Sequence, residues 1–317
     1  MKSRLLELLV CPSCKGKLKC EVYQESSEIE EGLLVCPRCK LTFPITKGVP
    51  RMLLSKTIES LSPTIESFGF EWSFFLEMWG EYKDEFLDWI YPIRPSFFKG
   101  KLVLDAGCGM GRHTYYSTKF GAETVGIDIS RAVDKAYFNT KGLERTHIVQ
   151  ADIYRLPFKN IFDFVYSIGV LHHLPNPEFG FKKLVEVLNS NGSIFAWVYG
   201  KNQLMLNVIE PLRKGITTRL PDDALKVLSF APTFFLFIVL KNFYNSNPKL
   251  PFNPYFYKLS KFHLKHLHEI VFDFLNVPIA NYYEEQEFKK WFEEVNLKNI
   301  RISCRNKNSW RGFGTLR

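Results

Sequence analysis

The chain has 317 residues, of which 46% are hydrophobic and 24% charged, and its formal net charge is +9. This length is enough for one large domain and a small one, and the composition excludes a disordered or collagen-like chain. The basic excess indicates an anionic partner, which could be nucleic acid, an anionic lipid surface or an acidic substrate.

The first residues, MKSRLLELLVCPSC, combine two positive charges with a short apolar run. Glu7 interrupts that run and no small-residue cleavage site follows, so no signal peptide is predicted. The seven cysteines are an odd number, which also argues against a disulfide framework. We therefore expect a cytoplasmic protein.

Two C-x-x-C pairs, CPSC and CPRC, lie near the N-terminus. Each pair can form a turn that directs two thiolates to one point, and two such turns complete a tetrahedral Zn²⁺ site. Four ligands leave no open position for water, so a structural zinc is predicted rather than a catalytic one. Unligated cysteines or a redox pair are the alternatives. The predicted ligands are Cys11, Cys14, Cys36 and Cys39.

Residues 18–24 and 32–36 are expected to be strands beside this site, and 41–53 a third extended piece. CPSC, CPRC, FPI (43–45) and GVPRM (48–52) together resemble the Trm112-like zinc ribbons. That family is known as an activating partner or a fused front end of methyltransferases. The resemblance implies a ribbon domain over 1–54, and its surface could bind a protein partner.

Residues 101–130 have the pattern of a strand, a glycine turn, a helix and a second strand that ends in Asp128. Such a βαβ unit belongs to a doubly wound sheet, which binds ligands outside the carboxyl ends of its strands. The turn, DAGCGMG (105–111), carries an acid that would repel a pyrophosphate but suits a ligand with an ammonium group. Because a lone glycine motif is weak evidence, the segments that follow must decide.

Those segments are HIVQADIYRLPF (147–158) and FDFVYSIGVLHHLPNP (162–177), each a strand followed by a turn. The series resembles the class I S-adenosylmethionine-dependent methyltransferases, in the methyltransferase type 11 or quinone-type subgroup. The resemblance implies that the glycine turn holds the methionine part of S-adenosylmethionine, Asp128 the ribose and Asp152 the adenine amino group. The cofactor residues so implied are Asp105, Gly107, Cys108, Gly109, Gly111, Asp128, Ile129, Asp152, Ile153 and Ser167.

The rest of the chain completes an α/β fold. A strand over 193–200, a helix over 284–297, and closing strands at 299–304 and 310–317 would make the Rossmann-like seven-stranded methyltransferase sheet, its last strand antiparallel. The methyltransferase domain is expected to span 55–317. Its helical stretch at 57–92 would cover the cofactor.

Residues 201–283 form an insertion between the fifth strand and the last helix. Ten of the Lys and Arg residues but only three acids lie between 201 and 268, and phenylalanines are frequent. The insertion is expected to be a helical substrate lid; a hairpin that only stabilises the sheet is the alternative. Its most apolar run, 230–240, is too short to span a bilayer and predicts a buried or interfacial helix.

The fourth strand ends in SIGVLHHL (167–174) and lacks the N-P-P-[FY] signature of amino-group methyltransferases. Methyl transfer needs positioning and, for a hydroxyl acceptor, a general base. His172 and His173 are the predicted candidates, because histidine has a suitable pKa.

The aromatic lid favours a small-molecule or lipid-like acceptor, methylated on oxygen or carbon, with peripheral membrane contact. Nucleic acid is expected to be the less favoured partner, since the basic residues of the lid lie outside its aromatic run. An RNA methyltransferase, and a non-catalytic module that binds cofactor and activates a partner, are the alternatives.

Overall fold

The computed structural model describes residues 1–55, 78–202, 205–244, 250, 253–277 and 279–316. Most of the predicted helical stretch 57–92 therefore lies outside the described residues. Its described part contains helix α4 (Tyr82–Trp89), followed by a short helix, η1 (Pro95–Phe98).

The N-terminal ribbon is a four-stranded antiparallel sheet in the order β1-β2-β3-β4, preceded by a short helix. Its two knuckles are built alike: the carbonyl of Cys11 accepts from Lys15 N–H and that of Cys36 from Lys40 N–H, each at 2.9 Å. These bonds fold each C-x-x-C pair back on itself. The ribbon elements are α1 (Ser3–Leu8), β1 (Lys19–Glu25), β2 (Ile29–Val35), β3 (Thr42–Thr46) and β4 (Val49–Pro50).

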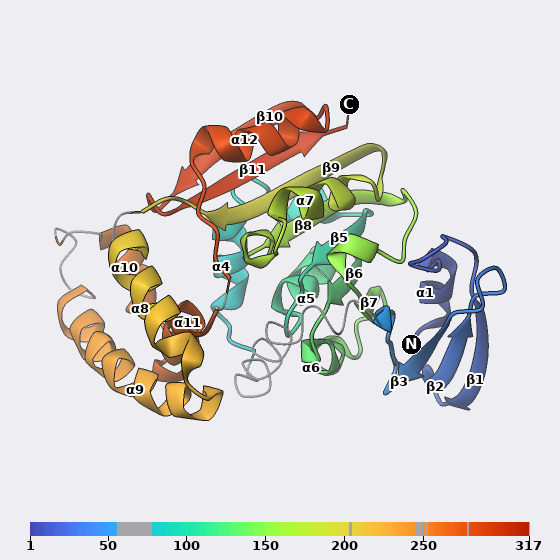
Figure 1. Ribbon diagram of the computed structural model, residues 1–317, viewed down its shortest axis with the longest axis horizontal. Coiled ribbons are helices and arrows are strands. Elements are labelled where there is room, and N and C mark those ends of the chain that lie inside the picture. Colours follow the sequence, from blue (N-terminus) through green and yellow to red (C-terminus); the bar gives the residue numbers. More distant parts are fainter. Residues whose placement is uncertain (56–77, 203–204, 245–249, 251–252, 278, 317) are drawn as a thin grey trace.

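The ribbon packs against the large sheet next to β7 (Figure 1). Met52 N–H donates to the Gln150 carbonyl at 2.8 Å, and Val10 N–H donates to the Pro157 carbonyl at 2.9 Å. One cluster of buried apolar side chains contains Leu5 and Phe43 of the ribbon together with Phe158 of the core. The ribbon and the core therefore share a hydrophobic interior.

The large sheet has seven strands in the order β10-β11-β9-β8-β5-β6-β7. The strands from β5 to β9 are parallel, and β11 is antiparallel to both of its neighbours. The predicted seven-stranded sheet with an antiparallel last strand is confirmed. The strands are β5 (Leu102–Ala106), β6 (Glu123–Asp128), β7 (Thr146–Gln150), β8 (Phe162–Ile168), β9 (Leu188–Tyr199), β10 (Lys298–Arg305) and β11 (Ser309–Thr315).

Helices cover both faces of this sheet, because its central strands are apolar on both sides. Helices α7 (Pro177–Val185) and α12 (Glu285–Glu294) pack on the face that includes Leu104. Helix α4, η1 and the end of α5 (Arg112–Lys119) pack on the face that includes Val103. A further helix, α6 (Ala132–Thr140), lies beside the glycine turn.

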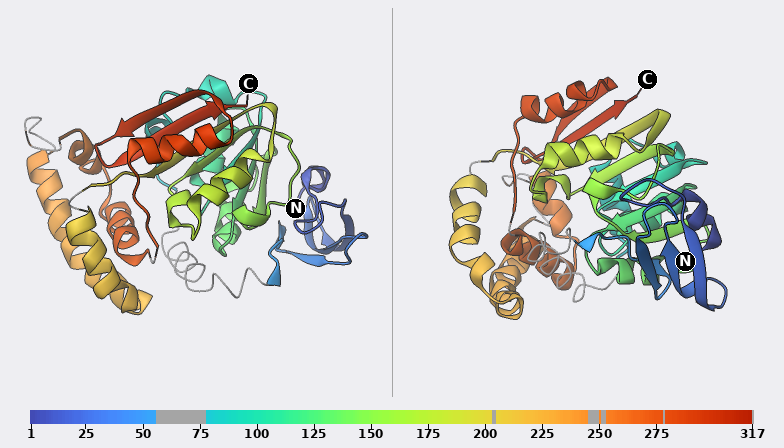
Figure 2. Two further views of the ribbon diagram at one scale, coloured as in Figure 1. Left: turned by 45° about the horizontal axis from the view of Figure 1, so that its top comes forward. Right: turned by 45° about the vertical axis from the view of Figure 1, so that its right-hand side comes forward.

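The insertion 201–283 is helical, as predicted. It forms a unit at the opposite end of the molecule from the ribbon (Figures 1 and 2). Within this unit α9 and α11 pack along each other. Its helices are α8 (Glu210–Gly215), α9 (Asp222–Val239), α10 (Asn253–Leu259) and α11 (Leu264–Asn276), with short turns η4 (Met205–Ile209), η5 (Thr217–Arg219) and η6 (Leu240–Tyr244).

The apolar run 230–240 lies in α9 and at the start of η6. The continuous helical span Asp222–Tyr244 has 23 residues and contains an 18-residue window with a mean hydropathy of 1.8, so it is long and apolar enough for a membrane span. One such helix is weak evidence of a membrane. The prediction allowed a buried or an interfacial helix, and the exposed side chains of Phe230, Phe234 and Phe235 exclude the buried one.

Candidate functional site

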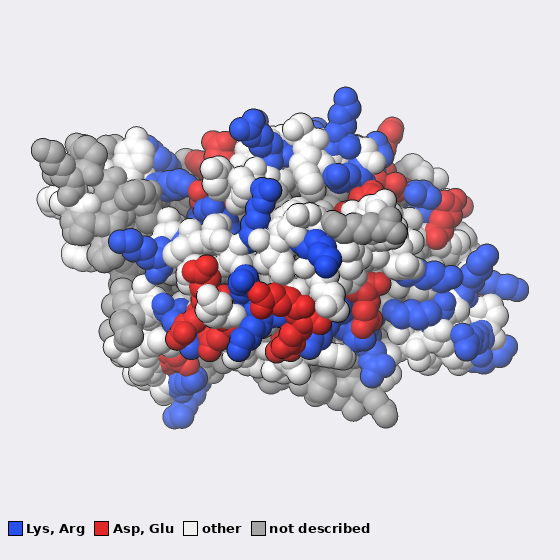
Figure 3. Space-filling view, turned by 90° about the horizontal axis from the view of Figure 1, so that it is seen from above, with Lys and Arg blue, Asp and Glu red and all other residues white. Residues whose placement is uncertain are grey.

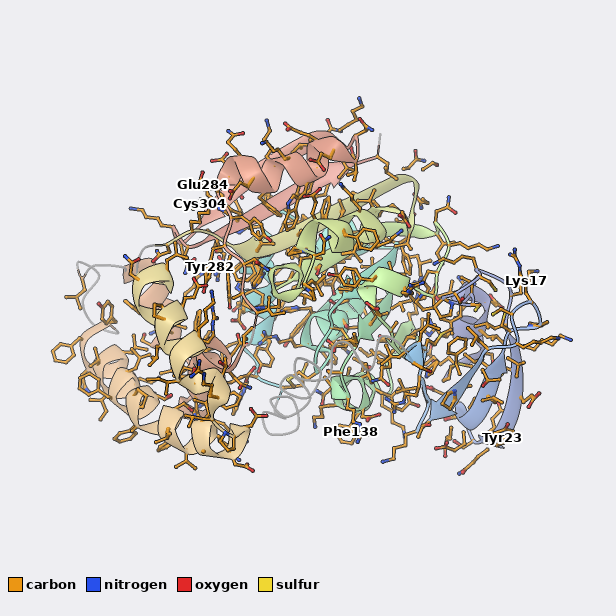
Figure 4. All side chains as sticks on the ribbon, viewed as in Figure 1. Lys17, Tyr23, Phe138, Tyr282, Glu284 and Cys304 are labelled. Atoms are coloured by element: carbon orange, nitrogen blue, oxygen red, sulfur yellow. The ribbon has the colours of Figure 1, made fainter. Side chains whose placement is uncertain are left out.

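A cavity of about 440 Å³ lies at the carboxyl ends of the parallel strands, where a doubly wound sheet binds its ligands. One half is walled by the turns that follow β5, β6, β7 and β8. The other half is walled by α4, the end of β9 and the lid helix α11. Figure 4 shows Tyr282, which lines the second half, between the helical unit and the sheet.

The glycine turn brings the backbone close to this cavity. Gly107 has φ +87°, and a Cβ there would lie 2.2 Å from Val170 Cγ2. No side chain fits at that position, because the turn after β5 and the turn after β8 approach too closely. The N–H groups of Gly107 and Cys108 both donate to the Ile127 carbonyl at 2.8 Å. Gly107, Cys108 and Gly109 thus form part of the cavity wall.

Asp128 lies at the end of β6 and lines the same half. Its Oδ1 accepts from the Ser130 N–H at 2.8 Å and from the Ser130 hydroxyl at 2.7 Å. Its Oδ2 accepts from the Gly109 N–H at 3.0 Å. A carboxylate oxygen has about two lone-pair sites, so Oδ2 keeps one for a ligand hydroxyl. Burial raises the pKa of this carboxyl, against the hydrogen bonds that lower it.

Three predicted cofactor residues do not line the cavity. Asp105 is buried and accepts the Thr114 hydroxyl at 2.6 Å; burial raises the pKa of its carboxyl to about 7. Ser167 donates to the Ala106 carbonyl at 2.9 Å inside the sheet. Gly111 packs on α6, where a Cβ would lie 3.1 Å from Ala136. These three residues therefore shape the glycine turn and support the segments that pack against it.

The remaining predicted cofactor residues, Ile129, Asp152 and Ile153, do line the cavity. The side chain of Asp152 accepts from the Tyr154 N–H at 2.8 Å and begins the short helix η2 (Ile153–Arg155). This hydrogen bond fixes the carboxylate at the edge of the cavity. Ile129 and Ile153 supply apolar surface on either side of it.

The two histidines occupy different positions in the short helix η3 (Leu171–His173). His172 does not line the cavity, and neither of its ring nitrogens has a hydrogen-bond partner among the described residues. His173 lines the cavity, and its Nδ1 lies 2.6 Å from the Ile279 carbonyl. Burial lowers the pKa of His173 to about 4, so it is a weak base.

Sequence patterns missed the second half of the cavity. Trp89, Trp197, Tyr199, Phe274 and Tyr282 form its aromatic wall. The Tyr199 ring is nearly parallel to those of Phe274 and Tyr282, with centroids 6.2 and 5.8 Å away. The indole nitrogens of Trp89 and Trp197 are buried and lack a hydrogen-bond partner within the described part of the chain. We call this half the aromatic chamber.

A carboxylate from the lid lines the same cavity. Asp273 is on α11, and burial raises its pKa to about 6, against the guanidinium groups of Arg112 and Arg213 that lower it. One turn earlier, Glu269 accepts from Tyr82 at 3.2 Å and lies 3.5 Å from Arg112. No sequence motif identifies Asp273, because α11 reaches the cavity only when the insertion folds over the sheet.

The four predicted zinc ligands are together in the ribbon. Their sulfur atoms all lie within 4.8 Å of one another, and the Cys11–Cys39 and Cys14–Cys36 sulfur pairs are both 3.5 Å apart. Zn–S bonds of about 2.3 Å at tetrahedral angles place the sulfurs about 3.8 Å apart. The cluster therefore fits one structural Zn²⁺.

Comparison with known families agrees with this geometry. The family described as "Methyltransferase domain" matches residues 104–196, which include the glycine turn, Asp128, Asp152 and the turn after β8. The core is a methyltransferase domain. The family described as "Trm112p-like protein" matches residues 2–48, and the four cysteines of this Trm112-like domain form its zinc cluster.

Among curated relatives, this chain is 38% identical over 107 residues to "tRNA U34 carboxymethyltransferase" of Proteus mirabilis, covering 31% of this chain and 32% of that protein. The protein of the same name from Aeromonas salmonicida is 35% identical over 100 residues, covering 30% and 31%. The chain thus spans about a third of these relatives. Among solved structures, magnesium protoporphyrin IX methyltransferase of Synechocystis matches with 16% identity and TM-score 0.47, covering 82% of this chain and 99% of that one.

These relatives correct two predictions. The leading prediction, a small-molecule or lipid-like acceptor with peripheral membrane contact, is wrong, because the relatives' names specify tRNA. For the same reason, the prediction that nucleic acid is the less favoured partner is wrong. The structure gives the reason. The prediction rested on the apolar run 230–240, yet no described residue of α9 lines the cavity. Its composition therefore carries no information about the acceptor.

S-adenosylmethionine fits the first half of the cavity: the close backbone of the glycine turn leaves space, and Asp128 Oδ2 can accept from a ribose hydroxyl. Asp128→Ala should therefore weaken cofactor binding by about 1.5–3 kcal/mol, or about 10- to 150-fold. Titration calorimetry measures this loss. Asp134→Ala, on the exposed side of α6, is the control and should leave the affinity unchanged. Equal affinity in wild type and Asp128→Ala would show that the carboxylate does not hold the cofactor.

Proposed function

We propose that this protein is an S-adenosylmethionine-dependent methyltransferase that modifies a base of tRNA. The names of several curated relatives of this chain specify tRNA, and the methyltransferase family model matches residues 104–196, which form much of the cofactor half of the cavity. We also infer a cytoplasmic location, since none of the seven cysteines forms a disulfide and the three outside the zinc cluster, Cys20, Cys108 and Cys304, lie apart from it, as is usual in reducing compartments. The domain division at residue 54 belongs to the same proposal.

The observation that carries this proposal is the aromatic chamber beside the cofactor half. Enzymes that modify a base take it out of the stack and hold it between aromatic side chains. The rings of Tyr199, Phe274 and Tyr282 offer such flat apolar surface. Trp89 and Trp197 extend this surface, since their rings stack with centroids 5.6 Å apart and both residues line the cavity.

In this proposal each part of the cavity has its own role in methyl transfer. When bound, S-adenosylmethionine supplies a methyl group already activated on a sulfonium. The glycine turn and Asp128 position the cofactor, and the chamber positions the base, which lowers the entropic barrier to an in-line displacement. Asp273 accepts the proton of a hydroxyl or N–H acceptor, because its carboxylate lines the cavity and has a pKa near neutrality.

His173 has a different part in this proposal. Its Nδ1–H donates to the Ile279 carbonyl, which lies on the segment that connects α11 to Tyr282. This hydrogen bond ties the turn after β8 to the lid. We therefore infer that His173 positions the chamber, and that the predicted proton transfer falls to Asp273.

Incubating the purified protein with unmodified tRNA and S-adenosylmethionine labelled in its methyl group should transfer label to one nucleoside. Mass spectrometry of the digested tRNA identifies that nucleoside and the group added. The Asp128→Ala variant is the control for cofactor-dependent transfer. Label that stays out of tRNA but enters a small molecule when a cell extract replaces the tRNA would contradict the proposal. A carboxymethyl product would contradict methyl transfer while leaving tRNA as the acceptor.

A further inference from the structure

We propose that the groove between the ribbon and the core binds a single-stranded stretch of RNA that leads to the base held in the aromatic chamber. We call it the ribbon–core groove; it is lined by Pro12, Lys15 and Leu41 of the ribbon and by Tyr154, Arg155 and Phe179 of the core, among others. This inference rests on the proposed function, because it takes RNA as the acceptor.

The groove adjoins the cofactor cavity. Asp152 and Pro175 line both of them, on the turns that follow β7 and the short helix η3. The groove volume is about 1430 Å³, several times that of the cavity. A chain that lies in the groove therefore reaches the rim of the cavity, at Asp152 and Pro175.

Positive charge gathers along this path. Four cations, Lys15, Arg155, Lys159 and Lys183, line the groove against two acids, Asp152 and Glu186. Arg155 and Lys159 are exposed, whereas Lys183 pairs with Glu186 at 2.6 Å. Cations on both walls suit a phosphate backbone, since neutralised phosphates release counterions.

The ribbon extends this charge beyond the groove. Its two knuckles, residues 11–20 and 36–41, contain five Lys and Arg residues and no acid. All five are exposed: Lys15, Lys17, Lys19, Arg38 and Lys40. Figure 3 shows Lys and Arg side chains gathered over the ribbon end of the molecule, and Figure 4 places Lys17 at the edge of the ribbon.

Aromatic rings lie among these charges. The Tyr154 and Phe179 ring centroids are 5.5 Å apart, and Phe179 is 43% exposed. The Tyr154 hydroxyl donates to the Asn176 carbonyl at 3.0 Å and accepts from the Asn176 N–H at 2.8 Å, so this ring is held in place. Lys183 Nζ lies 5.1 Å from the Phe179 centroid. Stacking surfaces beside cations are what binds single-stranded nucleic acid.

An acidic protein would satisfy the cations but would not need a fixed aromatic platform. The pairing of Tyr154 and Phe179 therefore favours RNA over a protein partner. The same contrast supplies an experimental comparison, because poly-glutamate carries the charge without the bases.

The test measures tRNA binding by fluorescence anisotropy over a range of salt concentrations. Arg155→Glu/Lys159→Glu should weaken binding at least about tenfold and reduce the salt slope by about 1 to 2, because two phosphate contacts are lost. Phe179→Leu should weaken it about fivefold or more with an unchanged slope, because stacking is lost and charge is kept. Cofactor affinity should stay at the wild-type value in both variants.

The matched control is Lys298→Glu/Arg301→Glu, which makes the same charge change on exposed residues of β10, at the sheet edge opposite β7. Equal tRNA affinity of the groove and control variants would overturn the inference and leave the proposed function standing. Displacement of tRNA by poly-glutamate at equal charge concentration would overturn it in favour of a protein partner. If the wild-type protein binds no tRNA, the proposed function itself is contradicted.

Discussion

Removing zinc from the four-cysteine cluster is expected to unfold the ribbon while the seven-stranded sheet stays folded. A module this small buries little apolar surface, so metal binding supplies most of its folding free energy, on the order of 10 kcal/mol for structural zinc. Cys36→Ser removes a fully buried ligand and should have the same effect as chelation. Hydrogen exchange should then become fast in β1 to β3 and remain slow in β5, β6 and β8.

Metal analysis of the purified protein should give one zinc per chain, and none for Cys36→Ser. Cys20→Ser and Cys304→Ser are the controls, because neither residue belongs to the cluster, and both should keep the metal. Zinc affinity should fall at acid pH, since protons compete for the thiolates. A zinc-free protein whose ribbon still protects its amides would refute this account of the fold.

Replacing Asp273 by Asn is expected to slow methyl transfer by about 10²- to 10⁴-fold, the usual contribution of a general base. The substitution keeps the size of the side chain, so the affinity for cofactor should not change. In the wild-type protein the base acts when deprotonated. Activity should therefore be full above pH 7, and should fall as the pH falls through about 6, the pKa of this carboxyl.

His173→Ala is the comparison that separates the two candidate bases. If His173 only positions the lid through Ile279, this variant should be less active but keep the acid limb near pH 6. The rates are measured under single-turnover conditions, so that product release does not hide the chemical step. Loss of the acid limb in His173→Ala, together with an unimpaired Asp273→Asn, would assign the proton transfer to His173.

Arg112 explains why the lid carboxylates can lie at the cavity. Its guanidinium is close to Glu85 and Glu269 and sits over the rings of Tyr82 and Trp89. It compensates part of the cost of burying carboxyl groups, although burial still raises the pKa of Glu269 to about 7. This network joins α4, α5 and α11, which come from three distant parts of the sequence.

Local sequence patterns were sufficient to predict the local features of the fold. The doubled C-x-x-C spacing specifies a metal site because each knuckle closes its own hydrogen-bonded turn, and the glycine turn specifies a close backbone approach because Gly107 admits no Cβ. The order of strands followed from alternating strand and helix patterns, which are local as well. Asp128 could be predicted because it is the last residue of the second strand in the βαβ unit that contains the glycine turn.

Which distant segments meet at the cavity depends on long-range packing that no local pattern records. No sequence motif links Asp273 to the aromatic residues of the aromatic chamber, because these residues lie on α4, β9, α11 and the segment before α12. The run 230–240 misled because composition cannot tell whether a helix reaches the cavity, and no described residue of α9 lines it. Asp105 and Gly111 match the glycine motif, yet their side of the turn packs inward. The groove beside the ribbon likewise exists only because β4 and its neighbours dock against β7, a contact between residues about one hundred positions apart.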